Sequence, residues 1–354
     1  CKCMTKILFL SGDQALIGGI EKYNHDLKES ISLCDADIRL VQRKQGGLAQ
    51  KILFLLKIAG KLLSNKFDYV VCGHLYFSSI PLVINLIFDT KYSISIYGIE
   101  AMRITNLLHR SALKKANKVI VISEYTKSLI SNQFNLPDHA YFYLPSSINE
   151  NIFNIQEDKA LLKKKYGLDG KLVILTLSRL SSDEEKGQHR VLKAFDKITN
   201  KDSNIKYVMA GPGEDERVER VLRGNVNLKN NAIQMGSVTP DQRVELYNLC
   251  DLFILPSKNE GFGIVFIEAL SCGIPIIASD GFGCREALLD GKLGHLVDPD
   301  DIDAIASKIT SVLQSVKGIT IDARVNIRNQ SIEMYGRNKW NERVGFFVQG
   351  MNNQ

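Results

Sequence analysis

Short runs of apolar, often β-branched residues recur along the whole chain, and each is followed by a segment with helical periodicity. In the first half they occupy residues 6–10, 69–72, 93–97, 118–122 and 141–144, and in the second half residues 172–177, 207–210, 232–235, 252–255 and 275–278. Because polar residues do not alternate within them, we expect strands buried on both faces, as in a parallel sheet covered by helices. The pattern predicts an α/β, doubly wound architecture in which all strands of a sheet end at one edge, where ligands bind.

This alternation is interrupted between residues 144 and 170, where a proline and a polar stretch separate two β-rich halves. A chain of 354 residues is long enough for about two domains. We therefore predict one Rossmann-like domain over residues 1–147 and a second over residues 148–334. The last segment, about residues 335–354, contains the only tryptophan, Trp340, and is expected to pack back onto the first domain as a helix.

Composition narrows the choice of partners and compartment. The net charge of +6 is too small to make nucleic acid the obvious partner, and no nucleic-acid-binding signature is present. The longest apolar stretches, about a dozen residues, are shorter than the roughly 20 that a membrane-spanning helix needs, and we expect no secretory signal. The seven scattered cysteines favour a reducing, cytoplasmic compartment. The close pair in Cys1-Lys2-Cys3 is assigned no function, because nothing nearby completes a metal site.

The segment 256–269 carries the strongest chemical signal. An expected strand leads into a turn and a helix start that contain Gly261, Phe262, Gly263 and Ile264. Glycines let the backbone approach a ligand closely, and a helix start offers free N–H groups to a phosphate. Glu260 lies in the turn and Glu268 about a turn and a half into the helix, so one carboxylate can face a sugar while the other reaches ribose hydroxyls. The alternative is a pair of surface glutamates beside an ordinary turn.

This segment resembles the E-x7-E motif of retaining GT-B glycosyltransferases, particularly glycosyltransferase family 4, or glycosyl transferases group 1. The similarity continues through residues 270–279, LSCGIPIIAS, and is densest over residues 172–299. The resemblance implies a GT-B fold, in which two Rossmann-like domains face each other across a cleft. It also implies that the C-terminal domain holds a nucleotide sugar, with Glu260 at the donor sugar and Glu268 at the ribose, and that the N-terminal domain holds the acceptor.

Arg179, followed by Lys186, is similar to the family's R…KG pair, which holds the donor diphosphate. The two residues are seven positions apart instead of the usual five, because of an insert at residues 182–185. Fixed cations suit this task, since the leaving nucleoside diphosphate gains negative charge as the glycosidic bond breaks. The resemblance implies that Arg179 and Lys186 act with Glu260 in catalysis without a metal ion. A solvated cluster of charges is the alternative.

Other loop residues match the family in the expected order. The resemblance implies substrate contacts for Gly18, Gly19, Gly211, Gly213, Ser237 and Val238. Both the loop with Gly211 and Gly213 and the segment 236–238 can instead contain purely turn-forming glycines. Tyr97 departs from the family, because many relatives have a histidine there that contacts the donor sugar. A tyrosine can donate one hydrogen bond but cannot become cationic near neutral pH, so whether Tyr97 replaces the histidine is open.

Residues 38–67 contain seven basic residues and no acidic one. On a helical wheel, apolar residues form one arc that is expected to face the sheet, with Phe54 exposed among lysines on the other. Two interpretations remain: a normally solvated helix face, or a surface that meets an anionic membrane or a polyprenyl-diphosphate acceptor through Lys51, Lys57 and Lys61.

Together with these residues, the resemblance implies a retaining, metal-independent hexosyltransferase that uses a UDP- or GDP-linked sugar. The acceptor is expected to be a glycan or a lipid-linked molecule in bacterial cell-surface polysaccharide synthesis. No cofactor and no nucleic-acid partner are expected, and the location is cytoplasmic, with peripheral binding to the inner face of the cell membrane as an open alternative. The competing interpretations are a GT-B nucleotide-sugar epimerase or phosphorylase, and a non-catalytic protein that binds sugar nucleotides.

Overall fold

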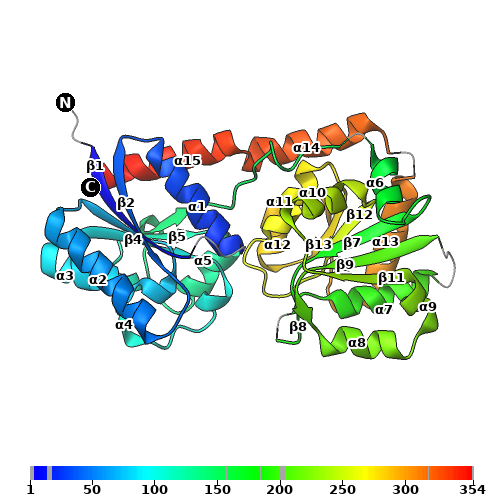
Figure 1. Cartoon of the computed structure of the whole chain (residues 1–354), viewed down its shortest axis with the longest axis horizontal. Helices are drawn as coiled ribbons and strands as arrows, with labels where there is room; N and C mark the ends of the chain where they lie inside the picture. Colours follow the sequence, from blue (N-terminus) through cyan, green and yellow to red (C-terminus); the bar gives the residue numbers. More distant parts are fainter. Residues whose placement is uncertain are drawn as a thin grey trace. The chain divides into compact units, whose positions relative to one another are not determined.

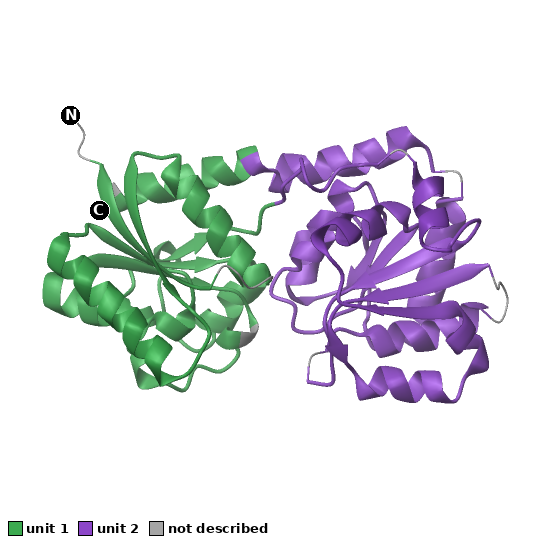
Figure 2. Ribbon diagram, in the orientation of Figure 1, with its two compact units in different colours: residues 1–147, 338–354 green, residues 148–337 purple. Residues whose placement is uncertain are grey.

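The computed structural model describes residues 4–13, 18–156, 158–183, 185–199, 204–317 and 319–352. It contains two compact units, coloured separately in Figure 2: unit 1 comprises residues 1–147 and 338–354, and unit 2 comprises residues 148–337. Each unit is built on a six-stranded sheet with helices on both faces (Figure 1). The predicted α/β, doubly wound fold class is therefore confirmed, whereas Cys1-Lys2-Cys3 lies outside the described residues.

Unit 1 has an all-parallel sheet in the order β2-β1-β3-β4-β5-β6. Its strands are β1 (Thr5–Gly12), β2 (Ala36–Arg43), β3 (Tyr69–Cys72), β4 (Lys91–Ile96), β5 (Lys118–Val121) and β6 (Tyr141–Tyr143). Its helices are α1 (Gly19–Ser32), α2 (Leu48–Ser64), α3 (Ser79–Phe88), α4 (Leu107–Lys115), α5 (Glu124–Ser131) and all but the first residue of α15 (Arg337–Asn352). Short 3₁₀ turns are η1 (Leu75–Phe77), η2 (Ile99–Ala101) and η3 (Asp138–Ala140).

The sheet of unit 1 is buried on both faces because its strands carry apolar residues at consecutive positions. Leu8 and Leu10 of β1 are fully buried in a core that includes side chains of α2, α3 and α4. Ile7 and Phe9 are equally buried and point to the opposite face, since successive side chains of a strand alternate. The aromatic ring of Trp340, in α15, packs edge-on against Tyr23 of α1, with 5.1 Å between ring centroids.

Unit 2 has an all-parallel sheet in the order β11-β9-β7-β12-β13-β14, and a two-stranded ribbon of β8 and β10. Its strands are β7 (Leu172–Leu177), β8 (Leu180–Ser181), β9 (Ile205–Ala210), β10 (Gly213–Glu214), β11 (Ala232–Gly236), β12 (Leu252–Leu255), β13 (Ile276–Ser279) and β14 (His295–Val297). Its helices are α6 (Lys159–Lys165), α7 (Gln188–Thr199), α8 (Glu216–Arg223), α9 (Val226–Asn231), α10 (Pro240–Leu249), α11 (Ile264–Ser271), α12 (Phe282–Ala287), α13 (Ile302–Ser315) and α14 (Ile321–Tyr335).

The ten predicted strands are present, but four others were not predicted: the edge strands β2 and β14, and β8 and β10, which have two residues each. β2 and β14 lie at the edges of their sheets, and only two residues of β2 and one of β14 are buried. Half-exposed edge strands carry polar residues, so they do not stand out as uninterrupted apolar runs. Because strands were predicted from uninterrupted apolar runs, β2 and β14 were not predicted.

Helix α2 is oriented differently from the prediction. Phe54 is buried, with its ring 5.4 Å from that of Phe77, and is not exposed among the lysines. Most of the expected inner arc is instead exposed, and the exposed apolar residues are Leu48, Ile52, Leu53, Leu55, Leu56 and Leu63. A helix that is apolar around most of its circumference has no unique inner face by hydrophobicity alone, and here the aromatic ring fills the space over the sheet. In the described part of the chain, no helix is both long enough and apolar enough to cross a membrane.

Candidate functional site

The strand order of unit 2 reverses next to β7. The chain proceeds from β7 through β9 to β11 on one side, and then returns to place β12 on the other side. All these strands are parallel, so the segments that follow β7 and β12 leave the same edge of the sheet in opposite directions. In open α/β sheets, such a reversal is where ligands bind. Arg179 follows β7 and Glu260 follows β12, so both candidate residues belong to this edge.

Lys186 and Glu260 meet directly. The Lys186 Nζ atom lies 2.9 Å from Glu260 Oε2, and the two side chains are 17% and 18% exposed. The loops that carry them are also joined through the backbone, because the amide of Lys258 donates to the carbonyl oxygen of Glu185 over 2.7 Å. Two residues that are 74 positions apart in the sequence thus form one partly solvated ion pair.

The insert before Lys186 is held at its last residue. Glu185 accepts hydrogen bonds from Arg190 and Arg217, each over 2.5 Å. Burial acts to raise the pKa of Glu185, but the two guanidinium groups outweigh it and hold that pKa below its usual value. The carboxylate therefore stays charged, and its two arginine partners fix the end of the loop from which Lys186 extends. Glu184 lies outside the described residues.

Two glycine-containing loops lie side by side at the same edge. The amide of Gly211 donates to the carbonyl oxygen of Gly236 over 2.7 Å, which joins the segment after β9 to the segment after β11. Gly211 has φ +143°, and a Cβ atom there would overlap the carbonyl oxygen of Ser178. Its turn-forming role is therefore required by the fold. Gly213, at φ +95°, is packed in the same way against the carbonyl oxygen of Leu180.

The remaining loop residues differ in exposure. Ser237 is exposed and Val238 is half-buried in the connection between β11 and α10, whereas the Arg179 side chain is exposed after β7. Phe262 is buried and packs edge-on against Tyr335, with 5.5 Å between ring centroids. Its side chain is therefore part of the core, and only its backbone is available to a ligand in the loop. The neighbouring Gly261 and Gly263 are also buried, and Ile264 is the first residue of α11.

Glu268 is enclosed in the protein. Its side chain is fully buried, Oε1 is paired with Arg243, and Oε2 accepts a hydrogen bond from the Tyr247 hydroxyl over 3.0 Å. Burial acts to lower the pKa of Arg243, but Glu268 outweighs that effect and raises it, so the guanidinium group stays charged. The sequence analysis missed both partners. Arg243 and Tyr247 share one face of α10 at i, i+4 spacing, but this spacing alone does not indicate which residue they contact.

In unit 1, Gly18 is the N-cap of α1 and Gly19 its first residue, and residues 14–17 lie outside the described residues. A Cβ atom on Gly18 would collide with the Glu21 carboxylate, which folds back over the helix start. Tyr97 follows β4 and is buried, and its hydroxyl donates to Asn24 Oδ1 (3.0 Å) or to the Gly73 carbonyl oxygen (2.9 Å). The Tyr97 hydroxyl thus has partners within the protein.

The structure adds a histidine that the sequence analysis did not select. His74 follows β3, and its ring centroid lies 6.0 Å from that of Tyr97. Burial lowers the pKa of His74, although Glu100 and Glu21 oppose this effect, so the imidazole is neutral near pH 7. Its position directly after a predicted strand, at the ligand-binding edge, was the available signal. The rings of His74 and Tyr97 therefore lie close to each other in unit 1, after β3 and β4.

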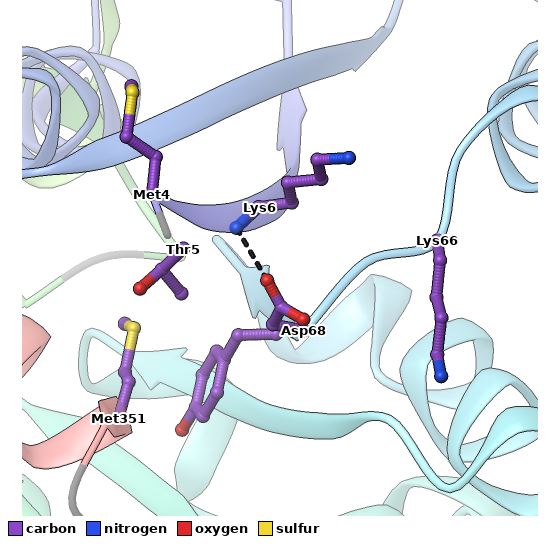
Figure 3. A pocket seen from close by; sticks show the side chains of 7 residues that line it. Met4, Thr5, Lys6, Lys66, Asp68 and Met351 are labelled. Carbon is purple, nitrogen blue, oxygen red and sulfur yellow. Dashed lines mark hydrogen bonds between the residues drawn. The ribbon is translucent and has the colours of Figure 1, made fainter. Parts of the chain in front are cut away.

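Two hollows lie where strands begin, at the ends opposite to those that carry the candidate residues. One, of about 390 Å³, is lined by residues at the starts of β1 and β3 and by Met351, and Lys6 donates its amide to Asp68 there (Figure 3). The other, of about 700 Å³, lies between α7 and α13 and reaches Leu172 and Ile205, the first residues of β7 and β9. Neither hollow contains a candidate residue.

Comparison with known sequences identifies the family. The sequence model described as glycosyl transferases group 1 matches residues 158–334, which is half of the chain. The chain is 27% identical over 216 residues to the GDP-mannose-dependent alpha-(1-6)-phosphatidylinositol monomannoside mannosyltransferase of Mycolicibacterium smegmatis, covering 58% of this chain and 56% of that protein. It is 31% identical over 205 residues to the lipopolysaccharide 1,2-N-acetylglucosaminetransferase of Salmonella typhimurium, covering 55% and 53%. The chain spans about half the length of these curated relatives.

Solved structures share the fold over nearly the whole chain. HepE of Anabaena, in complex with UDP and glucose, superposes with a TM-score of 0.77 at 18% identity and covers 98% of this chain and 99% of its own. Sucrose-phosphate synthase of Thermosynechococcus elongatus superposes with a TM-score of 0.81 at 17% identity and covers 99% of each chain. The two Rossmann-like units form the GT-B fold, and the chain belongs to the glycosyl transferases group 1.

Proposed function

We propose that this protein is a retaining glycosyltransferase that moves a hexose from a UDP- or GDP-linked donor to a glycan or lipid-linked acceptor. The reaction is proposed to need no metal ion and to serve bacterial cell-surface polysaccharide synthesis. The observation that carries the proposal is the Lys186–Glu260 pair at the edge where the strand order of unit 2 reverses. Family membership supports the same conclusion.

The charges at this edge suit a departing diphosphate. Arg179 is exposed after β7, and Lys186 is partly exposed beside Glu260, so both cations can approach an anionic ligand. Negative charge grows on the diphosphate as the bond to the sugar breaks, and cations that are already in place stabilise it without reorganisation. Lys186 is proposed to bridge the diphosphate and Glu260, whose carboxylate then faces the sugar.

Retention is proposed to follow from attack on the face that the diphosphate leaves. The bond between the anomeric carbon and the diphosphate oxygen breaks, and a bond between that carbon and the acceptor oxygen forms on the same face. The departing diphosphate oxygen takes the proton of the acceptor hydroxyl, so charge and atoms balance. Glu260 is assigned to stabilising the sugar rather than to a covalent intermediate, because Lys186 already pairs with its carboxylate.

Named relatives support the substrate classes. The mycobacterial relative is named for GDP-mannose and a phosphatidylinositol acceptor, and the Salmonella relative for lipopolysaccharide. The HepE structures contain UDP, glucose or UDP-glucose. These names favour a nucleotide-linked hexose as donor and a lipid-linked glycan as acceptor.

The ribose contact of Glu268 also stays a proposal. An ionised carboxylate has about four lone-pair positions, so an oxygen that is bound to Arg243 or Tyr247 can accept a further hydrogen bond. The side chain is fully buried, however, so ribose can reach it only if the residues that cover it move.

Release of nucleoside diphosphate tests the function. We expect release from the correct nucleotide sugar to require an acceptor, apart from slow hydrolysis, and to continue in excess EDTA because Arg179 and Lys186 supply the positive charge. A thermal-shift panel of UDP, GDP and their hexose conjugates identifies the donor, since a ligand that binds only the folded state raises the melting temperature of the protein. Conversion of donor alone would indicate an epimerase, and saturable binding without turnover a non-catalytic protein. Activity that EDTA abolishes and Mg²⁺ or Mn²⁺ restores would overturn the metal-independent mechanism.

Glu260→Gln is expected to lower kcat by about 10²–10³-fold, because it removes a charge that stabilises the transition state. The protein should stay folded, since the side chain lies in a partly exposed turn. Steady-state kinetics at saturating donor and circular dichroism measure the two effects. Glu333→Gln, an exposed glutamate of α14, is the matched control and should behave as wild type. Activity of the Glu260 variant within about twofold of wild type would remove Glu260 from the mechanism.

Glu268→Gln is expected to raise the KM for the donor and also to lower the melting temperature. The second effect arises because a neutral amide removes the counter-charge of Arg243, which is only partly exposed, and this costs up to about 3 kcal/mol. Tyr247→Phe removes only the hydrogen bond to Glu268 and should cost about 1 kcal/mol. Donor titrations and thermal unfolding of both variants provide the comparison. A lower melting temperature with unchanged KM would make Glu268 a purely structural residue.

A further inference from the structure

Exposed apolar residues are concentrated in one part of unit 1. Among the described residues, twenty-three large apolar side chains are exposed, and fourteen of them lie between residues 48 and 108. This segment is about one sixth of the chain. Single exposed apolar residues are ordinary on a protein surface, but a concentration of them marks an interaction site.

Helix α2 presents such residues along one side. The exposed apolar residues on that side are Leu48, Ile52, Leu55, Leu56, Ala59 and Leu63. At 3.6 residues per turn they fall within an arc of about 100°. Leu56 is 63% exposed and Leu63 is 90% exposed. Lys51 borders this arc, whereas Lys57 and Lys61 are exposed on the other side of the helix. An exposed apolar stripe opposite a face that carries lysines is typical of a helix that lies in a membrane interface.

The next two helices extend the apolar surface. The exposed apolar residues of α3 are Val83, Leu86, Ile87 and Phe88, and those at the start of α4 are Leu107 and Leu108. Helices α3 and α4 pack against each other, and α2, α3 and α4 cover the same face of the sheet of unit 1 (Figure 1). We call the exposed apolar side chains of these three helices, with Lys51, Lys57 and Lys61, the docking face.

The charge of these helices favours an anionic partner. Helices α2, α3 and α4 together carry six basic and no acidic side chains. Lysine is depleted in protein–protein interfaces, and two copies of such a face would repel each other. Apolar side chains among lysines match a bilayer surface, which offers acyl chains beneath anionic headgroups.

We propose that the docking face binds the surface of an anionic phospholipid bilayer. The apolar side chains of α2, α3 and α4 enter the boundary between headgroups and acyl chains, and Lys51, Lys57 and Lys61 lie among the phosphates. This placement reverses the orientation expected from the sequence, because leucines rather than Phe54 meet the lipid. The proposal goes beyond sugar transfer and does not depend on it, since binding to vesicles requires neither donor nor acceptor.

Co-sedimentation with phosphatidylcholine vesicles, with and without phosphatidylglycerol, tests the proposal on the full chain. The apolar variant is Ile52→Gln/Leu56→Gln/Leu63→Gln, which leaves every charge in place. The basic variant is Lys51→Gln/Lys57→Gln/Lys61→Gln. The matched control, Leu161→Gln/Val226→Gln/Ile321→Gln, replaces three exposed apolar residues of unit 2. Circular dichroism and melting temperature establish that each variant is folded.

Wild type and the control variant are expected to sediment with the anionic vesicles, and less so as salt is raised. The apolar and basic variants should each bind at least about tenfold more weakly. Wild type that stays in the supernatant at low salt would overturn the proposal, as would an apolar variant that binds like wild type. A dimer in sedimentation velocity that only the apolar variant abolishes, without vesicle binding, would assign the face to a second copy and also overturn it. Release of nucleoside diphosphate with a soluble acceptor is assayed separately, so that the proposed transfer reaction is tested independently of membrane binding.

Discussion

All strands of each six-stranded sheet run in one direction, and this constraint organises the molecule. Parallel strands require crossover helices, so both faces of each sheet are covered and the strands are apolar at consecutive positions. The same constraint brings every strand end of a unit to one edge. In unit 2 it gathers segments that follow β7, β9, β11 and β12, and these segments carry the candidate residues of that unit apart from Ile264 and Glu268, which belong to α11. The chemistry of the site is therefore positioned by the direction of the strands.

Two glutamates of one motif are held in different ways at this edge. Glu260 pairs with Lys186 where both side chains are partly exposed, so an anionic ligand can compete for the lysine. Glu268 is fully buried and pairs with Arg243, whose side chain is 25% exposed, so loss of the arginine would leave the carboxyl group without this partner in the interior. The first pair suits a site that exchanges ligands, whereas the second links α10 to α11. This difference supports the proposal that Glu260, rather than Glu268, faces the reacting sugar.

The sequence predicted the strands well because uninterrupted apolar runs have one physical explanation in a parallel sheet. The sequence predicted the structure less well where one pattern of apolar residues is compatible with several packing arrangements. The apolar stripe of α2 fits either the core or a surface, and only packing shows that Phe54 points inward. Edge strands such as β2 resemble surface loops in composition. Arg243 was missed because its partner is distant in the sequence and helical spacing does not reveal such a contact, whereas His74 had only its position after a predicted strand as a signal.

Amide hydrogen exchange with and without saturating UDP or GDP tests whether a nucleotide binds the strand-end loops of unit 2. We expect slower exchange in peptides that contain residues 178–187, 211–213, 236–238 and 256–264 for at least one of the two nucleotides. Exchange in α13, which lines the larger hollow at the opposite ends of the strands, should not change. Protection confined to α7 and α13, with residues 256–264 unaffected, would contradict the account.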